Sequence, residues 1–285
     1  MQDKLSNKKT TLNFGGILED INAPLVMGIL NLTPDSFYDG GKNGSIELSI
    51  NNVKKMLLDG ADIIDVGAYS SRPGANHISE QEELDRLIPV LKEIHSQFPD
   101  TKISVDTFRS NVAREAVKNG AVIINDISGG DLDTGMWKTV AELKVPYVLM
   151  HMQGNPKNMQ NNPTYVNVLD DVILALSSKV NKMTQLGIHD IIIDPGFGFG
   201  KTLEQNYEIL ARLNEFQMLG HPMLVGVSRK SMIYNLLDTD AENALNGTTA
   251  LHMLALERGA KFLRVHDIKE AKEVVAIWKM VNRNA

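Results

Sequence analysis

From Pro24 to the C-terminus the chain alternates between short apolar runs and longer amphipathic stretches, and this alternation limits the possible folds more than any other feature. The apolar runs are rich in β-branched residues, which is typical of strands buried on both faces of a parallel sheet. The predicted strands are Leu25–Asn31, Asp62–Gly67, Lys102–Asp106, Val122–Asn125, Pro146–Met150, Ile191–Asp194, Met223–Gly226 and Phe262–His266.

The intervening stretches have the 3.6-residue period of amphipathic helices. In the first of them Ile46, Ile50 and Val53 share one face, and Gly60 follows as a residue that favours helix C-termini. Ser79–Glu82 has the spacing of a capping box. The predicted helices are Ser45–Asp59, Ser79–Phe98, Ser110–Asn119, Thr164–Leu186, Asp240–Arg258 and Asp267–Val281.

Eight such strands, alternating with helices over roughly 260 residues, match the size of a (β/α)₈ TIM barrel. The hydrophobic content of 43% is enough for one large core, and no linker or composition shift marks a second domain. We therefore predict a single α/β barrel domain over residues 24–285, preceded by an N-terminal extension over residues 1–23 with a short hairpin at Thr11–Leu18. A doubly wound open sheet is the alternative, because periodicity alone does not show whether a sheet closes.

Composition limits the partners and the compartment. The net charge is −6 and no block of like charges occurs, which argues against nucleic acid or an anionic membrane as a partner. No apolar stretch has the length of a membrane helix, and the first nine residues lack the apolar core of a signal peptide. The absence of cysteine excludes disulfides and thiolate metal sites. We expect a cytoplasmic protein.

The run Ile191–Asp194 ends in a carboxylate, followed by Pro195 and glycines at 196, 198 and 200. A phosphate-binding P-loop needs glycine where Pro195 stands, and the dinucleotide fingerprint fails because Lys201 takes its sixth position. An acid at the end of a buried strand, next to a glycine-rich turn, instead indicates a binding site. The alternative is that Asp194 only caps the following turn.

The active site of a barrel lies at the C-terminal ends of its strands. Four residues there suit a planar heterocycle with several N–H donors and a carbonyl, because they offer two carboxylates, an amide and a cation: Asp106, Asn125, Asp194 and Lys230. Two of them, Asp106 and Asn125, have helix capping as an alternative role.

A second set suits an oxyanion such as phosphate or diphosphate: Asn31, Arg72, Arg264 and His266. His266 has a buried core position as its alternative. Asn31 can also offer a carbonyl oxygen to a hard cation such as Mg²⁺, which keeps most of its waters. The seven histidines contain no paired metal-ligand spacing, so a transition-metal site is not expected. The long loops at 31–41 and 67–77 are interpreted as covers over the site, with ordinary surface loops as the alternative.

Seven segments, in order and with matching spacing, resemble the dihydropteroate synthase family. They are Gly28–Phe37 with Asp39–Gly41, Ser71–Ala75, Ser104–Thr107, Ile124–Ile127, Asp194–Lys201, Ser228–Ser231 and Arg264–Asp267. The resemblance implies a (β/α)₈ barrel that condenses 6-hydroxymethyl-7,8-dihydropterin diphosphate with 4-aminobenzoate to give 7,8-dihydropteroate and pyrophosphate in folate biosynthesis.

The resemblance also implies residue roles. The pterin would be bound by Asp106, Asn125, Ile127, Met150, Asp194, Phe199, Gly226 and Lys230. The diphosphate and Mg²⁺ would be bound by Asn31, Arg72, Arg264 and His266, with Asn31 on the metal. The 4-aminobenzoate position would be lined by Phe37, Ser71, Pro73 and Ser228. The catalytic set would be Arg72, Asp106, Lys230, Arg264 and His266.

The implied route is dissociative and needs no covalent intermediate, which agrees with a chain that lacks cysteine and has no evident nucleophile–base pair. Tyr69 stands where the family pattern has an acid, and Ser71 where threonine is usual. These departures concern the 4-aminobenzoate position rather than the reaction. The terminal helix, with Ile277, Trp278 and Met280, could pack against a second subunit, so we expect a homodimer. A pterin-binding methyltransferase barrel and a non-catalytic ligand-binding barrel are the alternatives.

Overall fold

The structure is a computed structural model that describes residues 11–32, 41–69, 77–154, 159 and 163–283, with only the backbone described at 41–44. Within these residues, eight strands form one sheet in the order β8-β7-β6-β5-β4-β3-β10-β9. They are β3 (Leu25–Asn31), β4 (Ile63–Gly67), β5 (Lys102–Asp106), β6 (Ala121–Asp126), β7 (Tyr147–Met150), β8 (Ile191–Asp194), β9 (Leu224–Val225) and β10 (Phe262–Val265).

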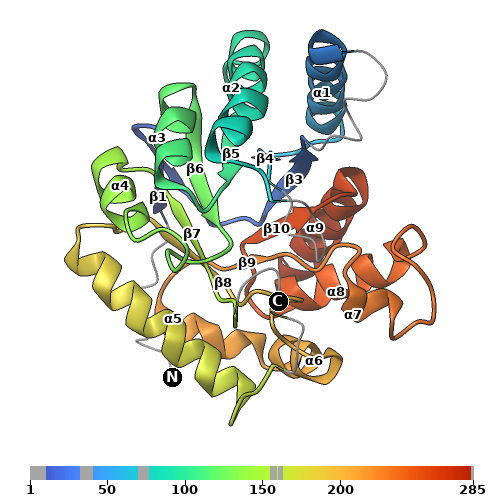
Figure 1. Ribbon diagram of the computed structural model, residues 1–285. Helices are drawn as coiled ribbons and strands as arrows, with labels where there is room; N and C mark the ends of the chain where they lie inside the picture. The colour runs from blue at the N-terminus through green and yellow to red at the C-terminus, as the bar shows by residue number, and fades with distance from the viewer. Residues whose placement is uncertain (1–10, 33–40, 70–76, 155–158, 160–162, 284–285) are drawn as a thin grey trace.

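The sheet closes into a barrel where β8 meets β9. Ile193 forms a parallel bridge with Met223 and donates its N–H to the carbonyl of Pro222 at 3.0 Å. The strand pairs along the sheet are all parallel, and the helices surround the strands (Figure 1). The predicted (β/α)₈ barrel is confirmed, and the alternative of an open doubly wound sheet is wrong.

Helices cover the outside of the barrel. They are α1 (Gly41–Leu58), α2 (Glu80–Gln97), α3 (Ser110–Lys118), α4 (Met136–Leu143), α5 (Val168–Gln185), α6 (Leu203–Ala211), α7 (Ser231–Tyr234), α8 (Leu245–Glu257) and α9 (Ile268–Asn282), with a 3₁₀ segment η2 (Leu213–Leu219). No described helix combines the length and the apolar composition needed to span a lipid bilayer.

The predicted helix boundaries were wrong in three places. α1 begins at Gly41 and not at Ser45. α5 begins after Asn167, whose side-chain oxygen accepts the N–H groups of Leu169 and Asp170, and not at Thr164. α8 begins at Leu245 and not at Asp240. The sequence analysis did not predict α4, α6, α7 or η2.

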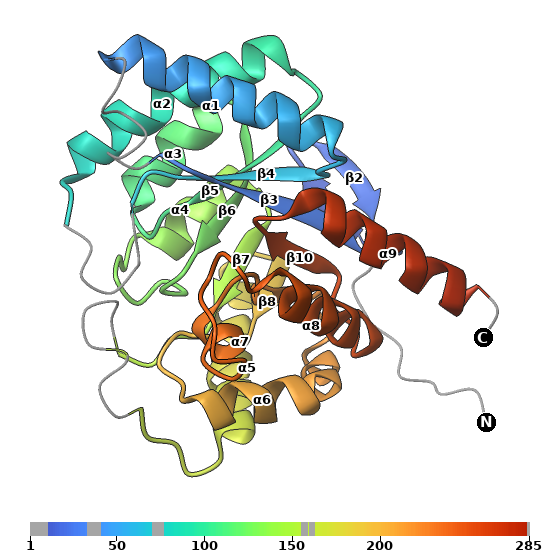
Figure 2. The ribbon, with the colours of Figure 1, turned by 90° about the vertical axis from the view of Figure 1, so that its right-hand side faces the viewer.

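The lower interior of the barrel, near the start of the strands, is apolar. Its buried side chains come from alternate residues of the strands, as expected for a barrel: Met27, Ile63, Ile123, Val148, Ile192, Leu224 and Phe262. We call this set the apolar layer. The predicted N-terminal hairpin, β1 (Thr11–Phe14) and β2 (Ile17–Asp20), closes this end of the barrel (Figure 2). Leu12 and Phe14 are 0% and 4% exposed and belong to the same cluster.

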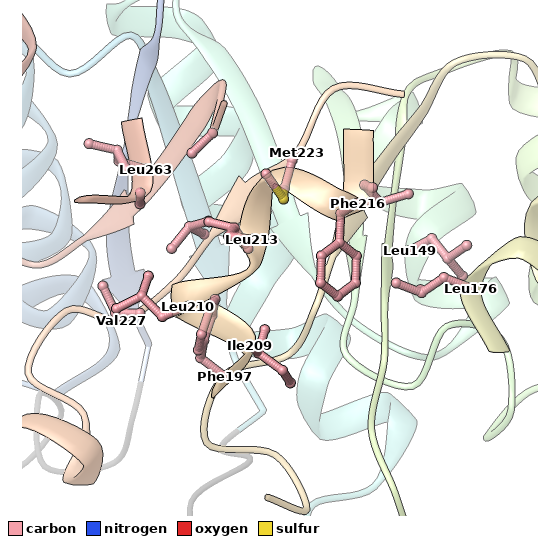
Figure 3. Close-up of a cluster of buried hydrophobic side chains, with 14 of the residues drawn as sticks. Leu149, Leu176, Phe197, Ile209, Leu210, Leu213, Phe216, Met223, Val227 and Leu263 are labelled. Atoms are coloured by element: carbon pink, nitrogen blue, oxygen red, sulfur yellow. The ribbon is translucent and has the colours of Figure 1, made fainter. Parts of the chain in front are cut away.

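A second apolar core fills the space between the strands and the surrounding helices. Phe216 of η2 and Leu176 of α5 are buried in it together with Leu149 of β7 (Figure 3). Burial of each such side chain contributes about 1.5–3 kcal/mol relative to exposure. This core holds the outer helices against the strands and therefore fixes the strand ends from which the candidate site is built.

Candidate active site

Two residues further along the strands, the barrel interior becomes polar. The alternation that directs the apolar layer inward also directs the next residue of the same parity inward. Four of these side chains are at most 6% exposed, and the fifth, that of Arg264, is 22% exposed. They are Asp65, Ser104, Asn125, Asp194 and Arg264, and we call this set the polar layer.

Arg264 links the polar layer to the mouth of the barrel. Its Nε donates to Asp65 Oδ2 at 2.7 Å, and its Nη2 donates to Asp106 Oδ2 at 2.8 Å. Asp65 Oδ2 also accepts a hydrogen bond from Asn125 Nδ2 at 3.0 Å. One guanidinium therefore lies between two carboxylates, and its fork geometry fixes both.

Asp65 is not among the predicted site residues, because it lies inside a strand and not at its end. The signal was present in the sequence, since Asp65 is a single acid inside the apolar run Ile63–Val66. A buried acid in such a run needs a partner to offset the loss of solvation. In this barrel the partners are Arg264 and Asn125.

Burial shifts the proton affinities in this group. It raises the pKa of Asp106 to about 7, against the opposing effect of Arg264, and Asp65 raises it further. Burial would lower the pKa of Arg264, but Asp65 and Asp106 outweigh this effect and raise it. Arg264 therefore stays charged, whereas Asp106 titrates near neutral pH.

The glycine-rich loop after β8 places Asp194 beside a second cation. Asp194 Oδ1 accepts the N–H of Gly196 at 2.7 Å, so this acid does cap the turn as well as facing the interior. Lys230 Nζ donates to the carbonyl of Phe197 and lies 4.6 Å from the ring centroid of Phe199. Burial raises the pKa of Asp194, and the charge of Lys230 opposes this shift.

Lys230 is itself affected by its surroundings. Burial lowers its pKa to about 8, and Arg264 lowers it further, while Asp194 and Asp106 act in the opposite direction. Gly226 lies between these two side chains, because a Cβ there would be 3.9 Å from Lys230 Nζ and 3.8 Å from Arg264 Cβ.

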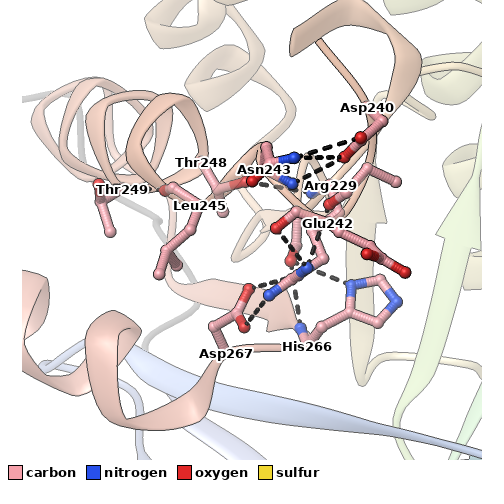
Figure 4. A network of polar contacts seen from close by, with 11 residues as sticks. Arg229, Asp240, Glu242, Asn243, Leu245, Thr248, Thr249, His266 and Asp267 are labelled. Atoms are coloured by element: carbon pink, nitrogen blue, oxygen red, sulfur yellow. Dashed lines mark hydrogen bonds and ion pairs between the residues drawn. The ribbon is translucent and has the colours of Figure 1, made fainter. Parts of the chain in front are cut away.

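A hydrogen-bonded ion pair joins the loop after β9 to the loop after β10. Arg229 donates from Nε and Nη2 to the two oxygens of Asp267, at 2.9 and 2.6 Å (Figure 4). The same arginine donates to the carbonyls of Ala241 and Glu242. These bonds hold a left-handed backbone at Arg229, which has a φ of +54°.

Ser228 and His266 also connect these two loops. Ser228 Oγ accepts the backbone N–H of His266 at 3.1 Å and lies 3.1 Å from His266 Nδ1. The sequence analysis identified no nucleophile–base pair, so it missed this contact, because the two residues are far apart in the chain. His266 is exposed, and the alternative of a core histidine is wrong.

The remaining predicted site residues divide into two groups. Met150 and Ile127 are 3% and 5% exposed, and Met150 pairs with Asp194 across the β7–β8 ladder. Asp106 and Asn125 use their side chains for the bonds described above, and the N-cap of α3 is Arg109. The predicted residues Phe37, Ser71, Arg72 and Pro73 lie outside the described residues, as do most of the two loops predicted as covers.

Known proteins resemble this chain closely in sequence and in structure. The family of pterin binding enzymes matches residues 27–266. The dihydropteroate synthase of Escherichia coli is 46% identical over 260 residues, which is 90% of this chain and 92% of the relative.

Two solved structures extend the comparison. The Yersinia pestis dihydropteroate synthase, solved with a sulfonamide drug, has a TM-score of 0.89 and 40% identity and covers 96% of this chain and 100% of its own. The Xanthomonas albilineans dihydropteroate synthase with 4-aminobenzoic acid has a TM-score of 0.89 and 39% identity, with 96% and 98% covered.

The chain belongs to the dihydropteroate synthase family. By sequence and by structure, its activity is that of a dihydropteroate synthase, a transferase of folate biosynthesis. The resemblance seen in the sequence is therefore confirmed, and the methyltransferase and non-catalytic alternatives are not supported.

Of the two positions expected to depart from the family pattern, Tyr69 lies within the described residues. Its ring packs edge-on against Phe108 at 5.0 Å, and the guanidinium of Arg109 lies 5.5 Å from its centroid. Arg109 pairs with the buried Glu83, which also accepts a hydrogen bond from Thr107 at 2.7 Å. Tyr69 thus packs against a buried ion pair that joins α2 to the N-terminus of α3.

Asn31 is suited to a magnesium ion that is held jointly by the protein and by a bound substrate. Asn31 is exposed at the end of β3, and β3 pairs with β10, the strand that carries Arg264. Across the part of the chain that the structure describes, no group of three His, Cys, Asp or Glu side chains is placed to hold a metal. A single amide oxygen next to an anion site fits Mg²⁺ that is bound largely by water and phosphate.

Proposed function

We propose that the chain catalyses the condensation of 6-hydroxymethyl-7,8-dihydropterin diphosphate with 4-aminobenzoate through the polar layer and the strand ends above it. The observation that carries the proposal is the buried acid Asp194 with the partly buried Lys230, whose charges interact, in the same barrel interior as the buried Asn125. An acid, an amide and a cation that are shielded from solvent form a site for a flat heterocycle that presents both donors and acceptors.

The pterin would bind by its polar edge. Asp194 would accept hydrogen bonds from a ring N–H and the amino group, and Lys230 would donate to the carbonyl and a ring nitrogen. Asn125 adds an amide, whose orientation Asp65 fixes through the bond from Asn125 Nδ2. Apolar contacts with the ring would come from Ile127, Met150 and Phe199, and Gly226 would leave room for it.

The diphosphate would lie at the cationic side of the mouth, against Arg264 and His266 and the predicted Arg72. Breaking the C–O bond places negative charge on the leaving diphosphate. Arg264, which two carboxylates hold in place before substrate binds, can stabilise that charge without reorganisation. One well-aimed donor of this kind contributes about 3 kcal/mol.

Asp106 would act on the other product of bond breaking, the positive charge on the pterin methylene. Its carboxylate lies at the end of β5, next to Arg264 and above the polar layer. An anion there stabilises a dissociative transition state electrostatically and forms no covalent bond. The arylamine of 4-aminobenzoate then attacks the methylene, and Phe37, Ser71, Pro73 and Ser228 would line its position.

We assign Mg²⁺ to Asn31, whose amide oxygen would hold the ion together with the substrate. When bound, the ion would neutralise charge on the leaving diphosphate. The 4-aminobenzoic acid in the Xanthomonas structure and the sulfonamide in the Yersinia structure support the choice of the second substrate and of sulfonamides as inhibitors.

We further propose that the chain is one barrel domain at residues 24–285 with an extension at 1–23, and that it acts in the cytoplasm as a homodimer. Ile277 and Met280 of α9 are 57% and 61% exposed, and an apolar helix face of this kind suits a second copy. A cytoplasmic location agrees with a charged diphosphate substrate, which does not cross membranes unaided.

The test is an assay of the purified chain with the pterin diphosphate and 4-aminobenzoate, in which pyrophosphate release and dihydropteroate formation are followed together. We expect equal amounts of both products, loss of turnover after exhaustive EDTA treatment, and recovery with Mg²⁺. Pyrophosphate release without dihydropteroate would contradict the condensation, and full turnover in EDTA would contradict the role of Mg²⁺.

A further inference from the structure

Lys201 is a buried lysine in the glycine-rich loop that the mechanism above does not use. It is 3% exposed. Burial lowers its pKa to about 7, and the charge of Asp194 opposes this shift. Its Nζ donates to the carbonyls of Gly196 at 2.9 Å and Phe199 at 3.1 Å, and it lies 3.4 Å from the carbonyl of His151. His151 Nδ1 is a further contact, at 3.1 Å. Because these acceptors use the N–H donors of Lys201, none is left to bind a phosphate.

The loop is packed so closely that its shape depends on these bonds. A Cβ on Gly196, where φ is +72°, would lie 1.9 Å from the carbonyl oxygen of His151. A Cβ on Gly200, where φ is +62°, would lie 2.5 Å from the carbonyl oxygen of Gln153. The backbone after β8 therefore lies directly on the backbone after β7. Lys201 joins the two, because it binds carbonyls from both.

The same loop carries the groups that face the proposed pterin site. Gly196 donates its N–H to Asp194 and accepts from Lys201 through its carbonyl, so the lysine and the acid bind opposite ends of one residue. Phe199, whose carbonyl Lys201 also holds, places its ring 4.6 Å from Lys230 Nζ.

Lys230 holds the loop from the other side. It donates to the carbonyl of Phe197, one residue after Gly196. The loop thus lies between two lysines, one buried beneath it and one in the site, and a shift of the loop would break its bonds to Asp194 and Lys230.

We propose that Lys201 is a positioning residue for the pterin: its buried ammonium holds the glycine-rich loop in the shape that places Asp194, Phe199 and Lys230 around the ring. The inference rests on the proposed binding of the pterin at Asp194 and Lys230. His151 supports it as an acceptor, because burial and the charge of Lys201 lower its pKa to about 3 and keep the ring neutral.

The experiment compares Lys201→Met, which keeps the length and removes the charge, with Lys201→Arg, which keeps the charge. A matched control is Lys272→Met, since Lys272 also makes a partly buried ion pair, with Asp62 at 3.0 Å near the start of the strands. The measurements are the calorimetric Kd of the unreactive 6-hydroxymethylpterin, the Michaelis constant for each substrate, and kcat.

We expect Lys201→Met to weaken binding of the pterin and to raise the Michaelis constant for the pterin diphosphate, each more than tenfold. The Michaelis constant for the arylamine substrate, measured at saturating pterin diphosphate, should stay within about twofold. Lys201→Arg should recover most of the affinity, and Lys272→Met should match the wild type. A folded Lys201→Met protein with wild-type pterin affinity would overturn the inference, and so would equal losses for both substrates.

Two further measurements keep the outcomes distinct. If Lys201→Met does not fold, Lys201→Gln, which retains one amide donor, takes its place with the same expected losses. Failure of both to fold would overturn the positioning role, because the lysine would then belong to the structural core. Asp194→Asn is measured in parallel: wild-type pterin affinity in that variant refutes the pterin placement itself, not the role of Lys201 alone.

Discussion

The apolar layer and the polar layer of the barrel lie two residues apart on the same strands, yet they differ in almost every physical respect. Ile63 and Ile192 are fully buried among hydrophobic neighbours beneath the N-terminal hairpin. Asp65 and Asp194, the next inward residues on those strands, are nearly as buried but carry carboxylates. Burial of apolar surface stabilises the fold, whereas burial of charge costs free energy that pairing only partly offsets.

This difference separates the work of the two layers. The apolar layer contributes stability and offers no polar or charged side chain to the substrates. The polar layer holds its charged groups in place through Arg264 and the glycine-rich loop before any substrate arrives. Preorganised charge of this kind favours the transition state, because no reorganisation is needed during the reaction. Substitutions in one layer should therefore affect stability, and substitutions in the other should affect activity.

The largest effect is expected for Asp194→Asn. Loss of the carboxylate removes the paired acceptor for the pterin, so kcat/KM should fall about 10³-fold, or about 4 kcal/mol. The free energy of unfolding should change by less than about 1 kcal/mol, since the amide oxygen still accepts from Gly196 and a buried charge is removed. Steady-state kinetics and urea unfolding measure the two quantities, and activity within tenfold of the wild type would break the comparison.

The opposite result is expected for the hairpin residue Phe14, which packs against the apolar layer. Phe14→Ala should lower the free energy of unfolding by about 3 kcal/mol through the lost contacts and the cavity that remains. The kcat/KM of the folded protein should not change. Leu18→Ala is the control, because Leu18 lies on the same hairpin with 67% of its surface exposed and should lose less than about 0.5 kcal/mol. A change in kcat/KM without a loss of stability would argue against the separation.

Two acids close together in the chain sharpen the comparison, because Asp65 lies in β4 and Asp62 lies just before this strand. Asp65→Asn removes the charge that orients Arg264, so kcat/KM should fall about 10²-fold, or about 2.7 kcal/mol. Asp62→Asn weakens the ion pair with Lys272 near the start of the strands and should cost at most about 1 kcal/mol of stability, with no loss of activity. Similar kinetic effects of the two variants would refute the role of Asp65.

The smallest expected effect is the dependence of kcat/KM on pH. The pKa of Asp106 is about 7 and that of Lys230 about 8, so kcat/KM should be highest between these values and fall about tenfold per pH unit on either side. Asp106→Asn should remove the acidic limb and leave a low rate. An acidic limb that persists in this variant would assign it to another group.

The raised pKa of Asp106 also makes the free energy of unfolding depend on pH. The pKa of Asp106 is raised in the folded chain, so the folded protein binds this proton more tightly than the unfolded one. The stabilising contribution is complete below about pH 4 and is lost as the pH rises to about 7. The free energies of unfolding of the wild type and of Asp106→Asn, compared from about pH 4 to about pH 7, measure this contribution.

The strands could be predicted from the sequence because each is a short β-branched run between turn residues. Ile191–Asp194 and Lys102–Asp106 have the predicted boundaries. α6 was missed although Thr202 and Gln205 form a capping box at its start. In the sequence, that segment was tested only as a nucleotide loop.

The candidate site was predictable only where a polar residue ends a strand. Asp194 and Asn125 met that condition, whereas Asp65, in the middle of β4, did not. The contacts between Ser228 and His266, and between Lys201 and Gly196, depend on the pairing of β9 with β10 and on loop shape. Neither property follows from residue spacing, so these contacts required the structure.

The most direct test of the account is a crystal structure of this protein with 6-hydroxymethylpterin. The account predicts that the ring lies above the polar layer, with Asp194, Asn125 and Lys230 each within about 3 Å of a ring nitrogen or oxygen. A ring bound elsewhere, with Asp194 and Lys230 making no contact to it, would contradict the claim that the polar layer is the pterin site.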